Sequence, residues 1–123
     1  IKKDFGLDVI AIYKRSANIL NSESKSKLEI VGSADPGLFK NDYEKNLYKK
    51  IHTIRKYFSS IGRDEDYDES LKTLSSAKIE VNEFFDNVIV NDQEELIKKN
   101  RLELLKMLCK SFDNYFNFSK IEA

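Results

Sequence analysis

Hydrophobic residues recur every three or four positions over four stretches of this chain, the spacing that places them on one face of an α-helix. The stretches cover residues 4–20, 41–61, 67–88 and 91–116. Glycine occurs only four times and proline once, which disfavours a turn-rich β architecture. The pattern therefore predicts an all-α fold, a single-domain bundle of four main helices over residues 1–123.

Residues that commonly begin or end helices stand at several of these boundaries. Asn41 is followed three residues later by Glu44, which is the spacing of a capping box at the start of the second helix. Gly62 stands where that helix is expected to end, because glycine is the usual residue after a helix C-terminus. Asn91 or Asp92 is predicted to cap the fourth helix in the same way as Asn41.

The segment between the first two helices is predicted to be an irregular connection. Residues 28–39, LEIVGSADPGLF, contain two of the four glycines and the only proline. Leu38 and Phe39 are large apolar residues at the end of this segment, so we expect both to pack onto the core.

The third stretch makes a prediction about two adjacent rings. Its apolar positions include Val81, Phe85 and Val88, so Phe85 is predicted to face the core, whereas Phe84 is rotated from it by about 100°. At least one of the two rings should be fully buried. Stacking on a nucleic-acid base is an alternative for the other ring. Lys78 also falls on this stripe, and we expect its amine to reach water while its aliphatic stem covers apolar surface.

The fourth helix is predicted to be the central element, because it is apolar along two adjoining stripes and therefore contacts more than one neighbour. Arg101 falls on one of these stripes, so its guanidinium is expected to be partly buried and to need a partner. The candidate partner is Asp86, which precedes a short connection. The two stripes are Ile97, Leu104, Leu108, Tyr115 and Leu102, Leu105, Cys109, Phe112, Phe116.

Net charge is zero, with 21 basic and 21 acidic residues, which does not by itself indicate a nucleic-acid-binding protein. The two signs are nevertheless segregated. Residues 64–69 hold five acids, whereas residues 45–61 hold five Lys or Arg, one His and no acid. On the second helix the spacing places four residues on one face, with Lys50 and Arg55 at its flanks. This basic stripe, either an ordinary solvated face or a phosphate-binding surface, consists of Lys45, Lys49, His52 and Lys56.

Catalytic chemistry is not indicated anywhere in the chain. His52 is the only histidine, so no histidine-based dyad or triad is expected, and it falls on the polar side of its helix. Cys109 lies on an apolar stripe, which favours a packed thiol over a nucleophile. No residues show metal-ligand spacing, and no glycine-rich loop suits a phosphate. The apolar stretches are too short to cross a bilayer, no signal peptide is recognised, and the start at Ile1 suggests a piece of a longer protein.

Several motifs occur in order along about a hundred residues. They are YKRSANIL at 13–20, ADPGLF at 34–39, a helix with Glu44 and Leu47-Tyr48, a helix that begins at Tyr67, and FFDNVIV at 84–90, followed by the helix start Asn100-Arg101-Leu102. Together they resemble the C-terminal anticodon-binding domain of the bacterial glycyl-tRNA synthetase beta subunit, a member of the DALR-type helical family. One position departs from the family pattern, since Lys98 stands where the family usually has arginine. Lysine keeps the charge but lacks the planar, bidentate donor pair.

The resemblance implies a cytoplasmic helical bundle that binds the anticodon arm of tRNA(Gly) and carries no catalytic site or cofactor of its own. It also implies that the domain belongs to a larger beta subunit, whose partner alpha subunit carries most of the ATP-dependent charging of tRNA with glycine. Basic residues of three helices are candidates for neutralising phosphates, and polar groups would recognise unstacked bases. These candidate tRNA-binding residues are Lys14, Arg15, Lys45, Lys49, His52, Lys56, Lys98 and Lys99.

Two alternatives remain open at this level. The first is the corresponding domain of an arginyl- or cysteinyl-tRNA synthetase, against which the FFDNVIV and ADPGLF segments argue. The second is a non-enzymatic protein-protein interaction module, with which the zero net charge is compatible. A module of this kind should bind neither tRNA(Gly) nor an unrelated tRNA.

Overall fold

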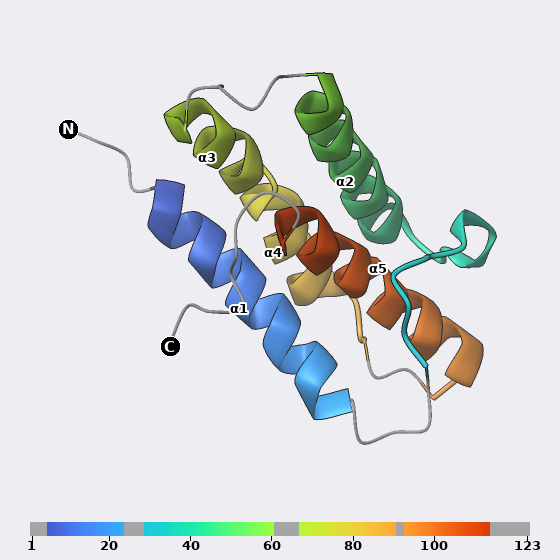
Figure 1. The fold of residues 1–123 in the computed structure, drawn as a ribbon. Helices are drawn as coiled ribbons and strands as arrows, with labels where there is room; N and C mark the ends of the chain where they lie inside the picture. Colours follow the sequence, from blue (N-terminus) through green and yellow to red (C-terminus); the bar gives the residue numbers. More distant parts are fainter. Residues whose placement is uncertain (1–4, 24–28, 61–66, 91–92, 114–123) are drawn as a thin grey trace.

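The computed structural model describes residues 5–23, 29–60, 67–90 and 93–113 of the chain, and every regular element in them is helical. The elements are α1 (Phe5–Glu23), the 3-10 turn η1 (Pro36–Leu38), α2 (Asp42–Ser60), α3 (Tyr67–Ser75), α4 (Lys78–Asn87) and α5 (Glu95–Asp113). They form one bundle (Figure 1). The predicted all-α class is confirmed.

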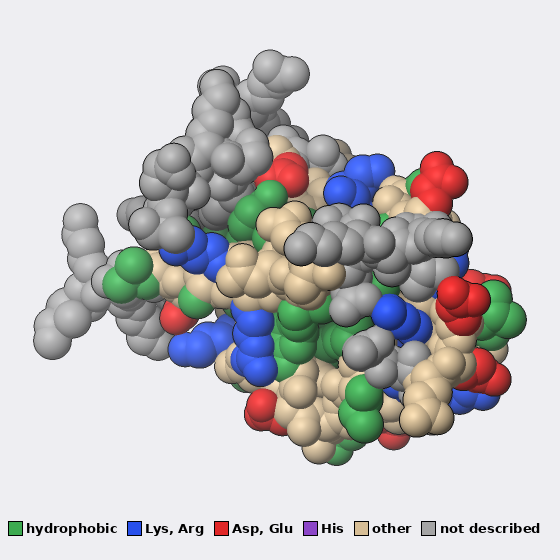
Figure 2. Space-filling view, turned by 90° about the horizontal axis from the view of Figure 1, so that it is seen from below, with side chains coloured by type: hydrophobic (Ala, Val, Ile, Leu, Met, Phe, Trp, Pro, Cys, Tyr) green, Lys and Arg blue, Asp and Glu red, His purple; other side chains and the backbone are tan. Residues whose placement is uncertain are grey.

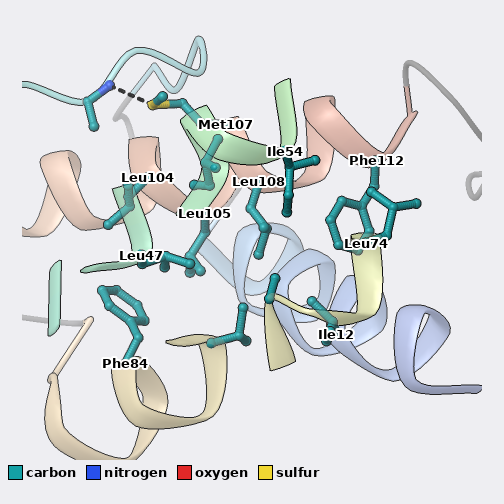
Figure 3. Close-up of a cluster of buried hydrophobic side chains, with 14 of the residues drawn as sticks. Ile12, Leu47, Ile54, Leu74, Phe84, Leu104, Leu105, Met107, Leu108 and Phe112 are labelled. Carbon is teal, nitrogen blue, oxygen red and sulfur yellow. Dashed lines mark hydrogen bonds between the residues drawn. The ribbon is translucent and has the colours of Figure 1, made fainter. Parts of the chain in front are cut away.

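The last helix, α5, is the centre of the bundle, as its two apolar stripes predicted. It packs against both α1 and α2, which lie on either side of it in Figure 1. Side chains from α5 meet Ile12 of α1 and Leu47 and Ile54 of α2 in the core shown in Figure 3. Tyr115 and Phe116 lie outside the described residues. The other predicted stripe residues of α5 are all buried: Ile97, Leu102, Leu104, Leu105, Leu108, Cys109 and Phe112.

The third predicted helix consists of two helices, α3 and α4, separated by a turn at Ser76 and Ala77. The Ser76 hydroxyl donates to the Thr73 carbonyl at 2.6 Å, and the Ala77 amide bonds to the Leu74 carbonyl, only three residues earlier. Serine hydroxyls compete with amides for helix carbonyls, which weakens the regular ladder. The 3-10 geometry that follows ends α3, and Ala77, which is fully buried, begins α4.

The capping box at α2 is present in a modified form. The Asn41 side chain accepts the Glu44 amide at 3.0 Å, as predicted. The Glu44 carboxylate accepts the amide of Lys40 at 2.8 Å, one residue before the expected donor. The predicted caps at Gly62 and at Asn91 or Asp92 lie outside the described residues.

Of the two adjacent rings of α4, Phe84 is the fully buried one. The prediction that at least one ring is buried is confirmed, but the assignment of Phe85 to the core was wrong. The buried face of α4 carries Val81 and Phe84, and Val88, the residue that follows the helix, is buried as well. Phe85 is half-buried and packs against the edge of that core, with its ring face under the guanidinium of Arg15.

The burial of Arg101 is confirmed, since only 6% of the residue is exposed. Its acidic partner is Glu44 of α2, with Nε 3.3 Å from Oε2, and its Nη1 donates to the Ile89 carbonyl at 2.7 Å. The predicted partner, Asp86, is an exposed residue of α4. Sequence proximity favoured Asp86, whereas packing places the start of α5 against the start of α2.

Several smaller predictions can be compared with the structure. Lys78 is exposed, as expected, and its amine lies 3.2 Å from the Asp8 carboxylate, a partner that was not predicted. Phe39 packs against the core and Leu38 is half-buried. Cys109 is a packed thiol, and burial followed by the nearby Asp113 charge raises its pKa to about 12. The thiol is therefore protonated at neutral pH.

Among the described helices, none combines the length and the apolar character needed to cross a bilayer.

Candidate nucleic-acid interface

The outer face of α2 carries the basic stripe. The helix buries one side, formed by Leu47, Ile51, Ile54 and Phe58, against its neighbours. The members of the basic stripe project from the other side, and all four are exposed. In the described part of the chain no ion pair links Lys45, Lys49 or Lys56 to an acid. The exposure predicted from the spacing is confirmed, and the role in tRNA binding stays a prediction.

The two basic residues at the flanks of the stripe contact the protein itself. Lys50 is half-buried and its amine lies 3.9 Å from the Glu80 carboxylate of α4. Arg55 donates from Nε to the Ser111 hydroxyl at 2.8 Å and contacts the Met107 carbonyl of α5 at 3.5 Å. These two side chains link α2 to α4 and α5, so the exposed basic side chains of α2 are those of the stripe.

The candidates Lys98 and Lys99 lie in the first turns of α5, close to the start of α2. Both are half-buried. The Lys99 amine is 2.7 Å from the Glu103 carboxylate, so part of its charge is balanced within the protein. Their position relative to α2 follows from Arg101, which is bonded to Glu44.

The candidates Lys14 and Arg15 belong to α1, on the other side of α5 from α2 (Figure 1). Lys14 is half-buried, and Arg15 is exposed. The Arg15 guanidinium lies 4.3 Å from the centre of the Phe85 ring, and its Nη1 is 3.4 Å from the Asn82 side chain. The eight candidates therefore form two groups: six on α2 and the start of α5, and two on α1.

The connection before α2 is held against α5 by a buried carboxylate. Glu103 is 1% exposed, and its Oε1 accepts the amides of Val31, Gly32 and Ser33 at 2.5–3.0 Å. Gly32 has a φ of 92°, a backbone conformation that side chains with a Cβ rarely adopt, so glycine is favoured at this position. Burial raises the pKa of Glu103, but the hydrogen bonds from Lys99, Ser33 and Gly32 outweigh burial and leave the pKa below its ordinary value.

Two more side chains of α5 hold the same connection. The Asn100 side chain accepts the Asp35 amide at 2.6 Å and donates to the Asp35 carbonyl at 3.0 Å. The Met107 sulfur accepts the Ala34 amide at 3.3 Å, the dashed contact in Figure 3. The course of residues 31–35 is therefore set by α5, and that course positions Phe39 beside α2.

Comparison with known proteins identifies the family. Residues 9–123 match the DALR anticodon binding domain. The chain belongs to this family. It is 36% identical over 119 residues to the glycine–tRNA ligase beta subunits of Rickettsia typhi and Rickettsia prowazekii, a stretch that covers 97% of this chain. The corresponding protein of Rickettsia bellii is 35% identical over 121 residues. The chain spans 17% of the length of these relatives.

The family motifs of this DALR anticodon-binding domain have structural roles where they are described. Asn100 and Arg101 of the Asn-Arg-Leu motif hold the connection and Glu44, and Leu102 is fully buried. The ADPGLF motif contributes the Asp35 cap of η1. The resemblance stated above is confirmed, and the Asn-Arg-Leu motif holds α5 against α2 and the connection.

His52 of the basic stripe and two neighbouring aromatic rings were not recognised as a unit from the sequence. The Phe39 and Tyr48 ring centres are 5.3 Å apart, and those of Tyr48 and His52 are 4.5 Å apart. We call Phe39, Tyr48 and His52 the ring cluster. The spacing of four between Tyr48 and His52 was the available signal, since such residues are neighbours on a helix. The place of Phe39 depends on the connection, for which the sequence carries no periodic signal.

The surface of the domain otherwise mixes the two signs of charge. On the face shown in Figure 2, Lys and Arg side chains lie among Asp and Glu side chains, with apolar groups between them. Among the described residues no group of three or more His, Cys, Asp or Glu is placed to hold a metal ion. The arrangement is suited to binding a polyanion along α2, because that helix is free of acids after its first turn.

Proposed function

We propose that this domain binds the anticodon arm of tRNA(Gly) and that α2 provides the main phosphate-binding surface. The observation that carries the proposal is the exposed basic stripe, which no acid interrupts over residues 45–61. A neutral chain does not attract nucleic acid through its overall charge, so the local excess on one helix decides where a polyanion binds.

The length of α2 suits the backbone of an RNA stem. Its 19 residues span about 28 Å at 1.5 Å per residue. Lys45, Lys49 and Lys56 are spread over three turns of this helix and neutralise successive phosphates, while Lys98 and Lys99 extend the surface at the start of α5. Lys14 and Arg15 lie on α1 and form a separate, second contact.

The wider function follows from the relatives, which are glycine–tRNA ligase beta subunits. In this proposal the domain is one part of a beta subunit, and it positions tRNA(Gly) while the chemistry takes place elsewhere. An alpha subunit supplies most of the catalytic site and uses ATP to attach glycine to the tRNA. The complex acts in the cytoplasm, where tRNA is charged.

The proposal is tested by removing charge from the stripe. The Lys45→Ala, Lys49→Ala, Lys56→Ala triple variant should fold normally, because all three side chains are exposed. It should bind tRNA(Gly) several-fold more weakly. The slope of log affinity against log salt should become shallower by about two to three units, nearly one for each phosphate contact. Circular dichroism and filter binding at four salt concentrations measure these effects.

A matched control removes the same charge from other helices. It is the Lys72→Ala, Lys78→Ala, Lys110→Ala triple variant, whose residues lie on α3, α4 and α5. Its salt slope should stay within half a unit of wild type. Equal losses in the two triple variants would mean that net charge, not the stripe, attracts the RNA. Wild-type binding to neither tRNA(Gly) nor an unrelated tRNA would instead support a protein-protein interaction module and refute the proposal.

A further inference from the structure

The ring cluster forms a continuous row from the core to the surface of α2. Phe39 packs against the hydrophobic core at one end and contacts Tyr48 with a 68° angle between ring planes. Tyr48 is half-buried and contacts His52 with an angle of 73°. His52 is the exposed member at the outer end. The row therefore ends in the His52 ring, which is exposed to solvent and packs on Tyr48.

The contact with Tyr48 leaves a face of the imidazole available. In an edge-to-face contact, one ring meets the other through its edge, so at most one face of His52 is covered by Tyr48. The contact with Tyr48, which itself packs on Phe39, favours one orientation of the His52 side chain before any ligand binds. A ring that is already ordered loses less conformational freedom on binding, which strengthens the complex.

The charges beside His52 indicate what the open ring binds. Lys49 precedes it by three residues and Lys56 follows it by four, so both lie on the same helical face, one turn on either side. Both lysines are exposed. An aromatic face between two cations matches a nucleotide, whose base stacks while the phosphates on its two sides meet positive charge.

We propose that His52, with Tyr48 and Phe39 as positioning residues, is a stacking site for one unpaired base of a single-stranded RNA loop. The inference rests on the proposed function and names the part of the RNA that the basic stripe engages: a loop base at His52, with the adjoining phosphates at Lys49 and Lys56. Stacking is tolerant of base identity, so this site contributes affinity and register rather than sequence selection.

The test uses the 123-residue chain and an RNA stem-loop with 2-aminopurine at one unpaired position. The fluorescence of this base falls when it stacks on an aromatic ring, and anisotropy of an end-labelled copy gives the affinity. His52→Gln removes the ring and keeps a polar side chain, whereas His52→Phe keeps a ring and removes the imidazole nitrogens. Tyr57→Leu is the matched control, because Tyr57 makes a similar edge contact with Phe58, at 5.0 Å, on the same helix.

We expect His52→Gln to bind about tenfold more weakly, the size of one base-ring stack, and to lose the fluorescence change. Its salt slope should equal that of wild type, since stacking releases no counterions. His52→Phe should keep the fluorescence change that His52→Gln loses, and Tyr57→Leu should bind like wild type. Tyr48→Leu should reduce the fluorescence change without changing the salt slope, because the open ring loses its support.

Two results would overturn the stacking site while leaving the proposed function intact. One is wild-type affinity and fluorescence change in His52→Gln. The other is an equal loss in His52→Phe and His52→Gln, which would assign His52 a hydrogen-bonding or charge role. Failure of the wild-type chain to bind any stem-loop would refute the proposed function and, with it, the stacking site.

Discussion

Arg101 and Glu44 form a buried ion pair. We therefore expect Glu44→Gln to lower the free energy of unfolding of the wild-type protein but to raise that of an Arg101→Met variant. Arg101→Met should lower the free energy of unfolding by about 3–5 kcal/mol, because it leaves the Glu44 carboxylate buried without its cation. The Glu44 side chain is 0% exposed and the Arg101 side chain 7% exposed, so water cannot replace the lost partner. A domain of 123 residues has a total stability of roughly 6–18 kcal/mol, so the loss is large but measurable.

The effect of Glu44→Gln on stability depends on which charge remains buried after the substitution. In wild type, Glu44→Gln removes the carboxylate opposite a buried guanidinium and should be destabilising by a similar amount. In the Arg101→Met background the same change removes an unpaired buried charge and keeps an oxygen for the Lys40 amide, so it should restore about 1–3 kcal/mol. The coupling energy of the cycle should therefore exceed about 2 kcal/mol.

Urea denaturation followed by circular dichroism gives the four free energies of unfolding. Lys78→Met is the control, since Lys78 and Asp8 form an exposed pair whose loss should cost no more than about 1 kcal/mol. If Glu44→Gln destabilises the Arg101→Met variant as much as it destabilises wild type, the two side chains are independent and the assignment of this pair is refuted.

Two further predictions concern the connection and the core. Because the folded-state pKa of Glu103 is lowered, its contribution to stability is present above the unfolded-state value of about 4.3 and is lost as the pH falls through the folded-state value. The free energy of unfolding of Glu103→Gln should thus lie below that of wild type at pH 7, and urea denaturation between pH 7 and pH 3 should show the two converging below about pH 4; a constant difference would contradict this. Phe84→Ala should destabilise by about 3–5 kcal/mol, because the ring is fully buried, whereas Phe85→Ala at the core edge should cost clearly less. Equal losses of thermal stability in the two variants would contradict the placement of Phe84 in the core and Phe85 at its edge.

The parts of the fold that follow from local spacing could be predicted, and those that depend on packing between distant segments could not. The buried side of α2 and the cap at Asn41 are local, and both are present as expected. The partner of Arg101 lies 57 residues away in sequence, and no periodic pattern points to it. The division between α3 and α4 lies beside Ser75 and Ser76, whose hydroxyls donate to helix carbonyls, and apolar spacing does not register such contacts.

The same distinction applies to the candidate interface. The basic stripe lies on one helix, so its exposure could be predicted from spacing alone. The separation of Lys14 and Arg15 from the other candidates depends on the position of α5 between α1 and α2, which the sequence does not state. The ring cluster combines two residues of α2 with Phe39 of the connection, and Glu103, which holds that connection, is an acid among buried leucines. A buried acid requires a hydrogen-bond partner, but the sequence does not show which residue that partner is.

The hydrogen bonds that hold residues 31–35 against α5 have a consequence for the order in which the domain folds. The contacts from Asn100, Glu103 and Met107 reach residues that are 65–73 positions earlier in the chain. Contacts of this separation form only after a large loop has closed, which is slow compared with the formation of the helices themselves. We therefore expect residues 31–35 to acquire their final course only when α5 has docked, and the contact of Phe39 with Tyr48 to form late in folding.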